Sequence, residues 1–151
     1  MVEGNIATCL DITKSSFHYQ KNIYMKQIIQ TEKAPAPIGP YSQAIKAGGL
    51  LFISGQVAID PATNEVIKGS VKDEARQVMK NIESILKDAN LTFQHVVKTT
   101  IFLTDMNLFA EVNEVYGSYF DGDYPARETV AVKGLPKNVN VEISMIASVS
   151  I

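Results

Sequence analysis

Two residues near the end of the chain have types and spacing that suit chemistry. Arg127 follows Pro125 and Ala126, and Glu142 lies in the next strand-like segment, after a short turn. A guanidinium stays protonated and only donates hydrogen bonds, so Arg127 suits the binding of an anion. A carboxylate accepts and returns protons, so Glu142 can act as an acid or a base. We therefore expect the two side chains to lie near each other, in a site that binds a carboxylate and exchanges protons with it.

Each candidate also has a structural interpretation that spacing does not exclude. Arg127 could pair with Glu128, its neighbour in the chain, and Glu142 could be a solvated strand residue. Three further polar residues have similar alternatives. Tyr41 could be a packed aromatic residue, Ser54 a strand residue whose hydroxyl is bonded locally, and Asn113 an exposed helix residue. The residues alone leave both interpretations open.

The few histidines and cysteines of the chain, and the motifs that it lacks, exclude several classes of enzyme. The chain has two histidines, His18 and His95, and one cysteine, Cys9. A catalytic triad or a histidine zinc site would have to be built on His95, which we interpret as a surface or loop residue. Nucleophile elbows, phosphate-binding loops and dinucleotide fingerprints are absent from the sequence. We expect no cofactor and no metal.

Composition indicates one globular domain with a substantial core. The chain has 151 residues, of which 46% are hydrophobic and 20% charged, and its net charge is -2. The lysines are scattered, so we expect no dedicated surface for nucleic acid. A lone cysteine is typical of a reducing compartment, and no apolar run reaches the roughly 18 residues of a membrane span. These features predict a soluble cytoplasmic protein with no membrane partner.

The chain divides into an N-terminal extension, residues 1–24, and a single domain, residues 25–151. The extension has no sustained hydrophobic period and its charges cancel, whereas Met25 opens a segment that looks like a normal protein start. We interpret the extension as a tag, an alternative start or an organelle-targeting segment. Its lack of arginine argues against a typical transit peptide.

Hydrophobic periodicity and turn residues predict the order β-β-α-β-α-β-β within the domain. The predicted strands cover residues 42–47, 50–59, 96–104, 128–134 and 139–149, and the predicted helices run from a Ser70 cap to about 89 and from after 105 or 107 to 120. This order predicts an α+β fold, a sheet with two helices on one face. The other face is half polar and could pack against copies of the chain, so we expect a homo-oligomer. Inside the second strand, Gly55 indicates a bulge or the close approach of another group.

Five short motifs occur in a fixed order along the domain: Gly39-Pro40-Tyr41-Ser42-Gln43, Ile53-Ser54-Gly55-Gln56, Pro125-Ala126-Arg127, Leu135-Pro136 and Val141-Glu142-Ile143. In order and approximate spacing they resemble the Rid family, also known as YjgF or endoribonuclease L-PSP, over residues 25–149. Because both the arginine and the later glutamate are present, the sequence looks most like the RidA branch of that family.

The resemblance implies a fold, an assembly and an activity. The fold is α+β and chorismate-mutase-like, and the assembly is a homotrimer with three ligand clefts between adjacent subunits. The activity is hydrolysis of reactive enamine and imine intermediates, such as 2-aminoacrylate and 2-iminobutyrate, to 2-keto acids and ammonia. A protonated imine is already electrophilic, so the protein mainly has to hold the substrate and place a water molecule.

The resemblance also implies roles for individual residues. Arg127 matches the arginine that clamps the substrate carboxylate, and Glu142 matches the carboxylate that positions or activates the attacking water. Tyr41 matches a cleft tyrosine supplied by the neighbouring subunit. The other matched substrate-binding positions are Ser54 and Gly55 on the pocket floor, with Asn113 and Thr129.

Two positions depart from the family pattern: Glu128 follows the arginine, and Ser144 replaces a second acid. Strand alternation predicts that Glu128 points away from Arg127, although it could compete for the guanidinium. Two other functions stay open. One is a single-strand ribonuclease or translation inhibitor, which the negative charge and few arginines disfavour. The other is a non-catalytic carboxylate binder or chaperone-like trimer.

Overall fold

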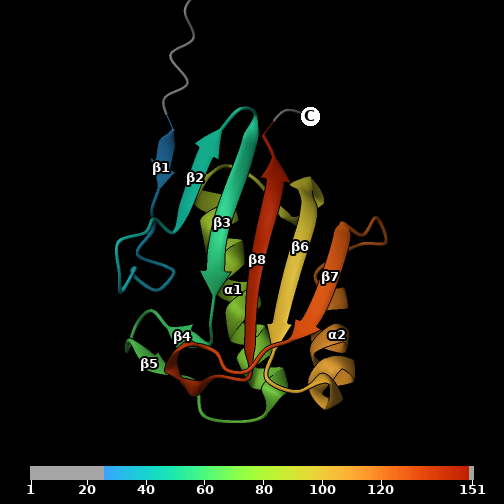
Figure 1. Ribbon diagram of the computed structural model, residues 1–151. Coiled ribbons are helices and arrows are strands. Elements are labelled where there is room, and N and C mark those ends of the chain that lie inside the picture. Colours follow the sequence, from blue (N-terminus) through green and yellow to red (C-terminus); the bar gives the residue numbers. More distant parts are fainter. Residues whose placement is uncertain (1–25, 150–151) are drawn as a thin grey trace, which may run out of the picture.

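A six-stranded mixed sheet organises the chain, with two α-helices on one of its faces (Figure 1). The computed structural model describes residues 26–149, so the predicted extension at residues 1–24 lies outside the described residues. In their order across the sheet, the strands are β1 (Gln27–Ile29), β2 (Ala44–Ala47), β3 (Leu50–Gln56), β8 (Val141–Ser148), β6 (Val96–Leu103) and β7 (Ala126–Ala131). Neighbouring strands are antiparallel, except that β7 runs parallel to β6.

The helices and smaller elements complete the domain. The two α-helices are α1 (Val71–Asp88) and α2 (Phe109–Gly117), and a two-stranded ribbon is formed by β4 (Ile59–Asp60) and β5 (Glu65–Val66). Three short 3-10 helices, η1, η2 and η3, cover Phe93–His95, Met106–Leu108 and Pro136–Asn138. Within residues 26–149, no helix combines the length and the apolar character needed to cross a membrane.

Helix α1 has an N-terminal cap and a buried face that its own sequence specifies, and a contact from β2 completes its C-terminal end. Ser70 caps its first turn by accepting from the Asp73 N–H, and the Asp73 carboxylate accepts from the Ser70 N–H in return. At the other end, the Lys46 ammonium donates to the Ala89 carbonyl. The predicted apolar stripe is the buried face of the helix. The sequence prediction for α1 is therefore confirmed.

The core lies between this helical layer and the sheet. Alternate residues of β8 point into it, and Val141, Ile143, Met145 and Ala147 are all buried. The side chains between them point to the other face, which no helix covers (Figure 1). This open face mixes apolar and polar groups, as predicted, and Phe52 on β3 is 43% exposed there.

The α+β fold with two helices on one face is confirmed, but the details differ from the predicted order. Strand β1 was not predicted, and β7 and β8 are not neighbours, because β6 lies between them. Helix α2 returns the chain so that β7 pairs in parallel with β6, and β7 ends where β6 ends. The predicted second strand stops at Gln56, since its register with β8 shifts after Ile53 and the chain then turns.

Candidate active site

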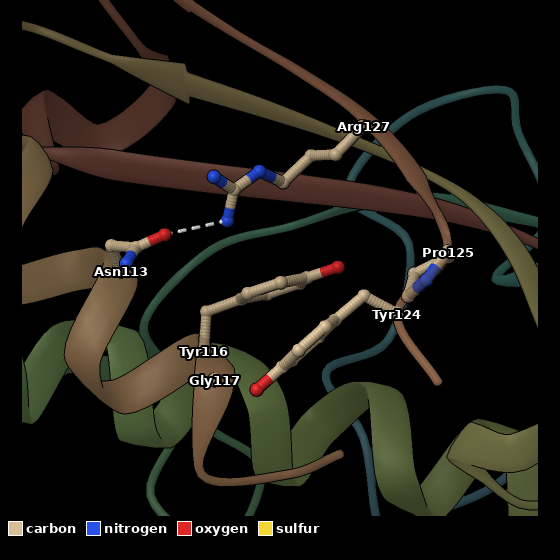
Figure 2. Close-up of a pocket in the computed structure, with 6 residues that line it drawn as sticks. All are labelled: Asn113, Tyr116, Gly117, Tyr124, Pro125 and Arg127. Atoms are coloured by element: carbon tan, nitrogen blue, oxygen red, sulfur yellow. Dashed lines mark hydrogen bonds between the residues drawn. The ribbon is translucent and has the colours of Figure 1, made fainter. Parts of the chain in front are cut away.

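Arg127 extends from β7 toward the helical layer. It lies in register with Thr99 of β6, a buried residue on the helix-covered face. Its Nη1 donates a hydrogen bond of 2.8 Å to Oδ1 of Asn113 on α2, and Figure 2 shows the guanidinium extended over the Tyr116 ring. The guanidinium carbon is 4.9 Å from the centroid of that ring and 5.6 Å from the Phe109 ring centroid. These distances are those of cation–π contacts.

The guanidinium borders a pocket of about 480 Å³, which we call the arginine pocket. The residues that line it are Asn113, Tyr116, Gly117, Tyr124, Pro125 and Arg127 (Figure 2). Among residues 26–149, no carboxylate forms a salt bridge with Arg127. The pocket therefore holds a fixed positive charge whose remaining donors are available to an anion from outside the chain.

Glu128 does not compete for this guanidinium. It lies in register with Thr100 and points to the open face, where its carboxylate accepts from the Lys98 ammonium and the Thr100 hydroxyl. Those two hydrogen bonds lower the pKa of Glu128. The prediction that Glu128 points away from Arg127 is confirmed, and the alternative of an Arg127–Glu128 salt bridge is wrong.

Glu142 lies at a second pocket, of about 370 Å³, which we call the glutamate pocket. Tyr41, Ser54 and Gly55 line it together with Glu142, and apolar side chains including Ile38 complete its wall. No hydrogen bond or salt bridge to the Glu142 carboxylate is found among residues 26–149. Burial raises the pKa of Glu142 above its ordinary value of 4.5, because partial removal from water disfavours the charged form. A carboxylate with a raised pKa and free lone pairs suits proton transfer.

Gly55 lets the Glu142 side chain reach this position. A Cβ atom added at Gly55 would lie 1.9 Å from Oε1 of Glu142, well inside van der Waals contact. The register shift between β3 and β8 falls at this point, so the predicted bulge and the predicted close approach are both present. The approaching group is the Glu142 side chain.

Two local networks shape the rest of the glutamate pocket. The Ser54 hydroxyl donates to the Ser42 carbonyl at 2.7 Å, and Ser54 also lines the pocket. The buried Gln43 amide donates to the carbonyls of Ala34 and Pro35, and thereby fixes the proline-rich loop that leads to Tyr41. The Tyr41 side chain is exposed at the pocket.

The expectation that Arg127 and Glu142 lie together within one chain is wrong. Arg127 is in register with Thr99 of β6, whereas Glu142 pairs with Phe102 of the same strand. Positions separated by an odd number of residues point to opposite faces of a strand. Arg127 therefore faces the helices and Glu142 faces the open side, and the sheet lies between them.

The predicted site residues divide accordingly. Asn113 lies with Arg127 at the arginine pocket, whereas Tyr41, Ser54 and Gly55 lie with Glu142 at the glutamate pocket. Thr129 is on the same face of β7 as Arg127 but lines neither pocket. Its hydroxyl is buried and has no hydrogen-bond partner in the described part of the chain.

Several site residues carried no signal of function in the sequence. Phe109 and Tyr116 fall in the second predicted helix, where aromatic side chains indicate only packing, and their contact with Arg127 depends on how α2 packs beside β7. Lys137 lines the glutamate pocket from η3, where it adopts a left-handed backbone conformation with φ of 60°. That conformation is uncommon outside glycine and asparagine, so the residue type gave no indication of it.

His95 lines neither pocket. It lies in η1, where its Nδ1 accepts from the Thr92 N–H at 3.2 Å. Among residues 26–149, no group of three or more histidine, cysteine, aspartate or glutamate side chains is arranged to hold a metal ion. Glu142 is the one carboxylate among the residues that line the two pockets, so it is the candidate for proton transfer.

The fold and the pockets define a small α+β protein with the arginine pocket beside one face of its sheet and Glu142 on the other. The sequence profile of the family described as endoribonuclease L-PSP matches residues 31–149. This chain therefore belongs to the endoribonuclease L-PSP family, which is the Rid or YjgF family that its motifs resemble.

Relatives with known sequences and structures agree with this assignment. A RutC family protein of Pyrococcus horikoshii is 56% identical over 123 residues, which cover 82% of this chain and 98% of the relative. The 2-iminobutanoate/2-iminopropanoate deaminase of mouse is 49% identical over 123 residues, covering 82% of this chain and 91% of that protein. The crystal structure of Escherichia coli TdcF with bound serine has a TM-score of 0.77 and 42% identity, and covers 81% of this chain and 98% of that one.

Proposed function

We propose that this protein hydrolyses reactive 2-imino acids and their enamine tautomers, such as 2-iminobutyrate and 2-aminoacrylate, to 2-keto acids and ammonia. The observation that carries the proposal is the state of Arg127. Its guanidinium is held at a pocket by Asn113 and two aromatic rings, yet no carboxylate of the described chain neutralises it. A small substrate with a carboxylate supplies the missing anion.

The reaction requires the protein mainly to place the substrate and a water molecule. With its carboxylate on Arg127, the substrate presents a protonated imine carbon to water, and Glu142 accepts a proton as the water oxygen bonds to that carbon. The same glutamic acid then returns this proton to the nitrogen of the resulting carbinolamine. As the carbon–nitrogen bond breaks, the hydroxyl oxygen becomes the keto oxygen and its proton passes to the departing ammonia. Water and the iminium are thus converted to a 2-keto acid and ammonium, and Glu142 regains its starting state.

This mechanism needs Arg127 and Glu142 at the same substrate, although one chain places them on opposite faces of its sheet. We propose that a homotrimer resolves this, with the arginine pocket of one copy facing the glutamate pocket of the next. Each cleft would then receive Arg127 and Asn113 from one subunit, and Tyr41 and Glu142 from its neighbour. A closed ring of copies supplies three such clefts through one repeated contact.

The relatives support the chemistry chosen here. The mouse protein that shares 49% identity is named for deamination of 2-iminobutanoate and 2-iminopropanoate. The Escherichia coli relative was crystallised with serine, an amino acid whose carboxylate is the group that we assign to Arg127. The ribonuclease in the family name has less support, because the one described histidine lies outside both pockets.

The proposal is tested with 2-iminobutyrate generated in the cuvette, by following the release of ammonia or 2-oxobutyrate. Arg127→Ala should reduce hydrolysis to the uncatalysed rate and leave the assembly intact. Arg76→Ala is the matched control, because Arg76 is the other arginine of the chain and pairs with Asp73 on the surface of α1. Equal turnover by Arg127→Ala and the wild type would refute the mechanism. Ligand binding that depends on Arg127 without any turnover would instead support a carboxylate-binding protein.

A further inference from the structure

The Arg127 guanidinium has more donors than the chain uses. Nη1 donates to Asn113, while Nε and Nη2 have no hydrogen-bond partner in the described part of the chain. A guanidinium presents five N–H groups in a rigid plane, and two parallel bonds from one edge match a carboxylate. Arginine side chains have several rotatable bonds, so one hydrogen bond leaves the orientation of that edge weakly defined.

One face of α2 supplies further contacts to this guanidinium. Phe109, Asn113 and Tyr116 follow one another at steps of four and three residues, which places them on the same side of a helix. Asn113 contacts the guanidinium through its amide oxygen, and the two rings contact it through their faces. The Tyr116 ring is the nearer, with 4.9 Å between its centroid and the guanidinium carbon. Figure 2 shows Tyr116 beneath the guanidinium and Asn113 at its end.

Tyr116 is itself firmly held. It is 3% exposed, its ring packs against Phe120, and its hydroxyl donates to Oγ1 of Thr99 at 3.2 Å. Thr99 is fully buried and is the residue of β6 in register with Arg127. The ring thus rests on the same strand pair that carries the guanidinium. Burial raises the pKa of the Tyr116 hydroxyl, against smaller opposing effects of Thr99 and Arg127, so the ring stays neutral at neutral pH.

We infer that Tyr116, assisted by Phe109, is a positioning residue that fixes the plane of the Arg127 guanidinium, so that Nη1 donates to Asn113 and the Nε–Nη2 edge faces the ligand. The effect of Tyr116 on catalysis rests on the proposed deaminase function, whereas the effect of Tyr116 on the order of the Arg127 guanidinium does not. A positioned donor edge binds a carboxylate with less loss of conformational freedom, so loss of the ring should appear in KM.

The physical claim can be measured directly, because the chain has two arginines. Proton–nitrogen NMR of the arginine Nε–H groups therefore gives two signals, and Arg76 serves as an internal reference for an exposed side chain. In the wild type we expect a higher order parameter for Arg127 than for Arg76. Tyr116→Leu should lower the Arg127 value toward that of Arg76, whereas Tyr116→Phe, which keeps the ring, should preserve most of it. An unchanged Arg127 signal in Tyr116→Leu would overturn the inference.

Kinetics on the same proteins test whether this order matters. Tyr116→Leu should raise KM for 2-iminobutyrate by about 3- to 30-fold with a smaller change in kcat, the range expected for loss of a partly buried cation–π contact. Tyr119→Leu is the matched control: its ring packs on Phe93 and it lies outside the arginine pocket. If Tyr116→Leu fails to fold, Phe109→Leu removes the second ring from a less buried position and is expected to move both readouts in the same direction.

The outcomes separate this inference from the proposed function. Loss of Arg127 order together with a raised KM supports both. Loss of order with an unchanged KM in an active enzyme would refute the positioning role. If the wild type does not hydrolyse the imine at all, the proposed function fails, and the NMR comparison still decides whether Tyr116 orders the guanidinium.

Discussion

Gly55 and Glu142 form a pair in which one residue makes room for the other. The carboxylate oxygen occupies the space that a side chain at position 55 would fill, and the carboxylate has no partner in the described chain to hold it elsewhere. The sequence pointed to Gly55 because a glycine inside a strand is unusual, and to Arg127 and Glu142 because the family motifs favour a function that the residues alone leave open. It did not reveal that Arg127 and Glu142 face opposite sides, since that depends on β6 lying between β7 and β8.

Gly55→Ala should therefore impair catalysis more than folding. The added methyl group would displace the end of the flexible Glu142 side chain, which can rotate away without moving the backbone. We expect kcat to fall by about 10-fold or more, because a small misplacement of a catalytic group is costly. Steady-state kinetics and thermal melting of the same sample check this. Full activity in Gly55→Ala would show that the position of Glu142 does not matter for turnover.

The raised pKa of Glu142 predicts the acid limb of the pH–rate profile. The proposed mechanism needs the ionised carboxylate to accept a proton from water, so kcat/KM should fall as pH decreases through the pKa of this group. Burial places that pKa above 4.5, so activity should decline at a higher pH than for an exposed glutamate. Glu142→Gln should lose most activity and the acid limb with it. An acid limb that survives in Glu142→Gln would assign it to another group.

The raised pKa of Glu142 makes the stability of the protein change with pH in the opposite direction from its activity. The folded protein binds the Glu142 proton more tightly than the unfolded chain does. Proton binding by Glu142 therefore adds most to the free energy of unfolding below pH 4.5, and this addition is lost as pH rises through the pKa of Glu142 in the folded protein. Above that window, Glu142→Gln should equal or exceed the wild type in free energy of unfolding. Chemical denaturation at two pH values, at one protein concentration, measures the difference.

At the scale of elements, α1 does more than cover the sheet. Its buried Glu74 accepts 2.7 Å hydrogen bonds from both the backbone N–H and the side-chain amide of Asn140, the residue just before β8. The helix thereby fixes the start of the strand that carries Glu142. The limits of α1 could be predicted because its cap and stripe are local, whereas the parallel pairing of β7 depends on contacts between distant segments.

Glu74→Ala should destabilise the protein by about 1–3 kcal/mol, since it removes the charged acceptor of two partly buried donors of Asn140. Glu74→Gln keeps an acceptor and should cost less. Glu83→Ala is the matched control on the same helix, because Glu83 forms an exposed pair with Lys87 and its loss should be worth about 0.5 kcal/mol or less. Denaturant unfolding would contradict this account if Glu74→Ala and Glu83→Ala proved equally stable.

At the scale of the whole molecule, one chain carries two incomplete sites. Among residues 26–149, no carboxylate lines the arginine pocket and no arginine lines the glutamate pocket, and the sheet lies between Arg127 and Glu142. The open face also leaves Phe52 exposed between Ile45 and Ile146 of the neighbouring strands, which is the kind of apolar patch that another copy could cover. Both features follow if the working unit is an assembly in which neighbouring copies complete each other's clefts.

Subunit mixing tests this central claim most directly. Arg127→Ala and Glu142→Gln should each have little activity as pure proteins, because each lacks half of every cleft. After equal amounts are unfolded and refolded together, about a quarter of the clefts in random trimers should combine an intact Arg127 with an intact Glu142 from its neighbour. We therefore predict recovery of about a quarter of wild-type activity on 2-iminobutyrate, and none when the double variant replaces either partner. A mixture that remains inactive, although mass spectrometry shows mixed trimers, would contradict a site shared between subunits.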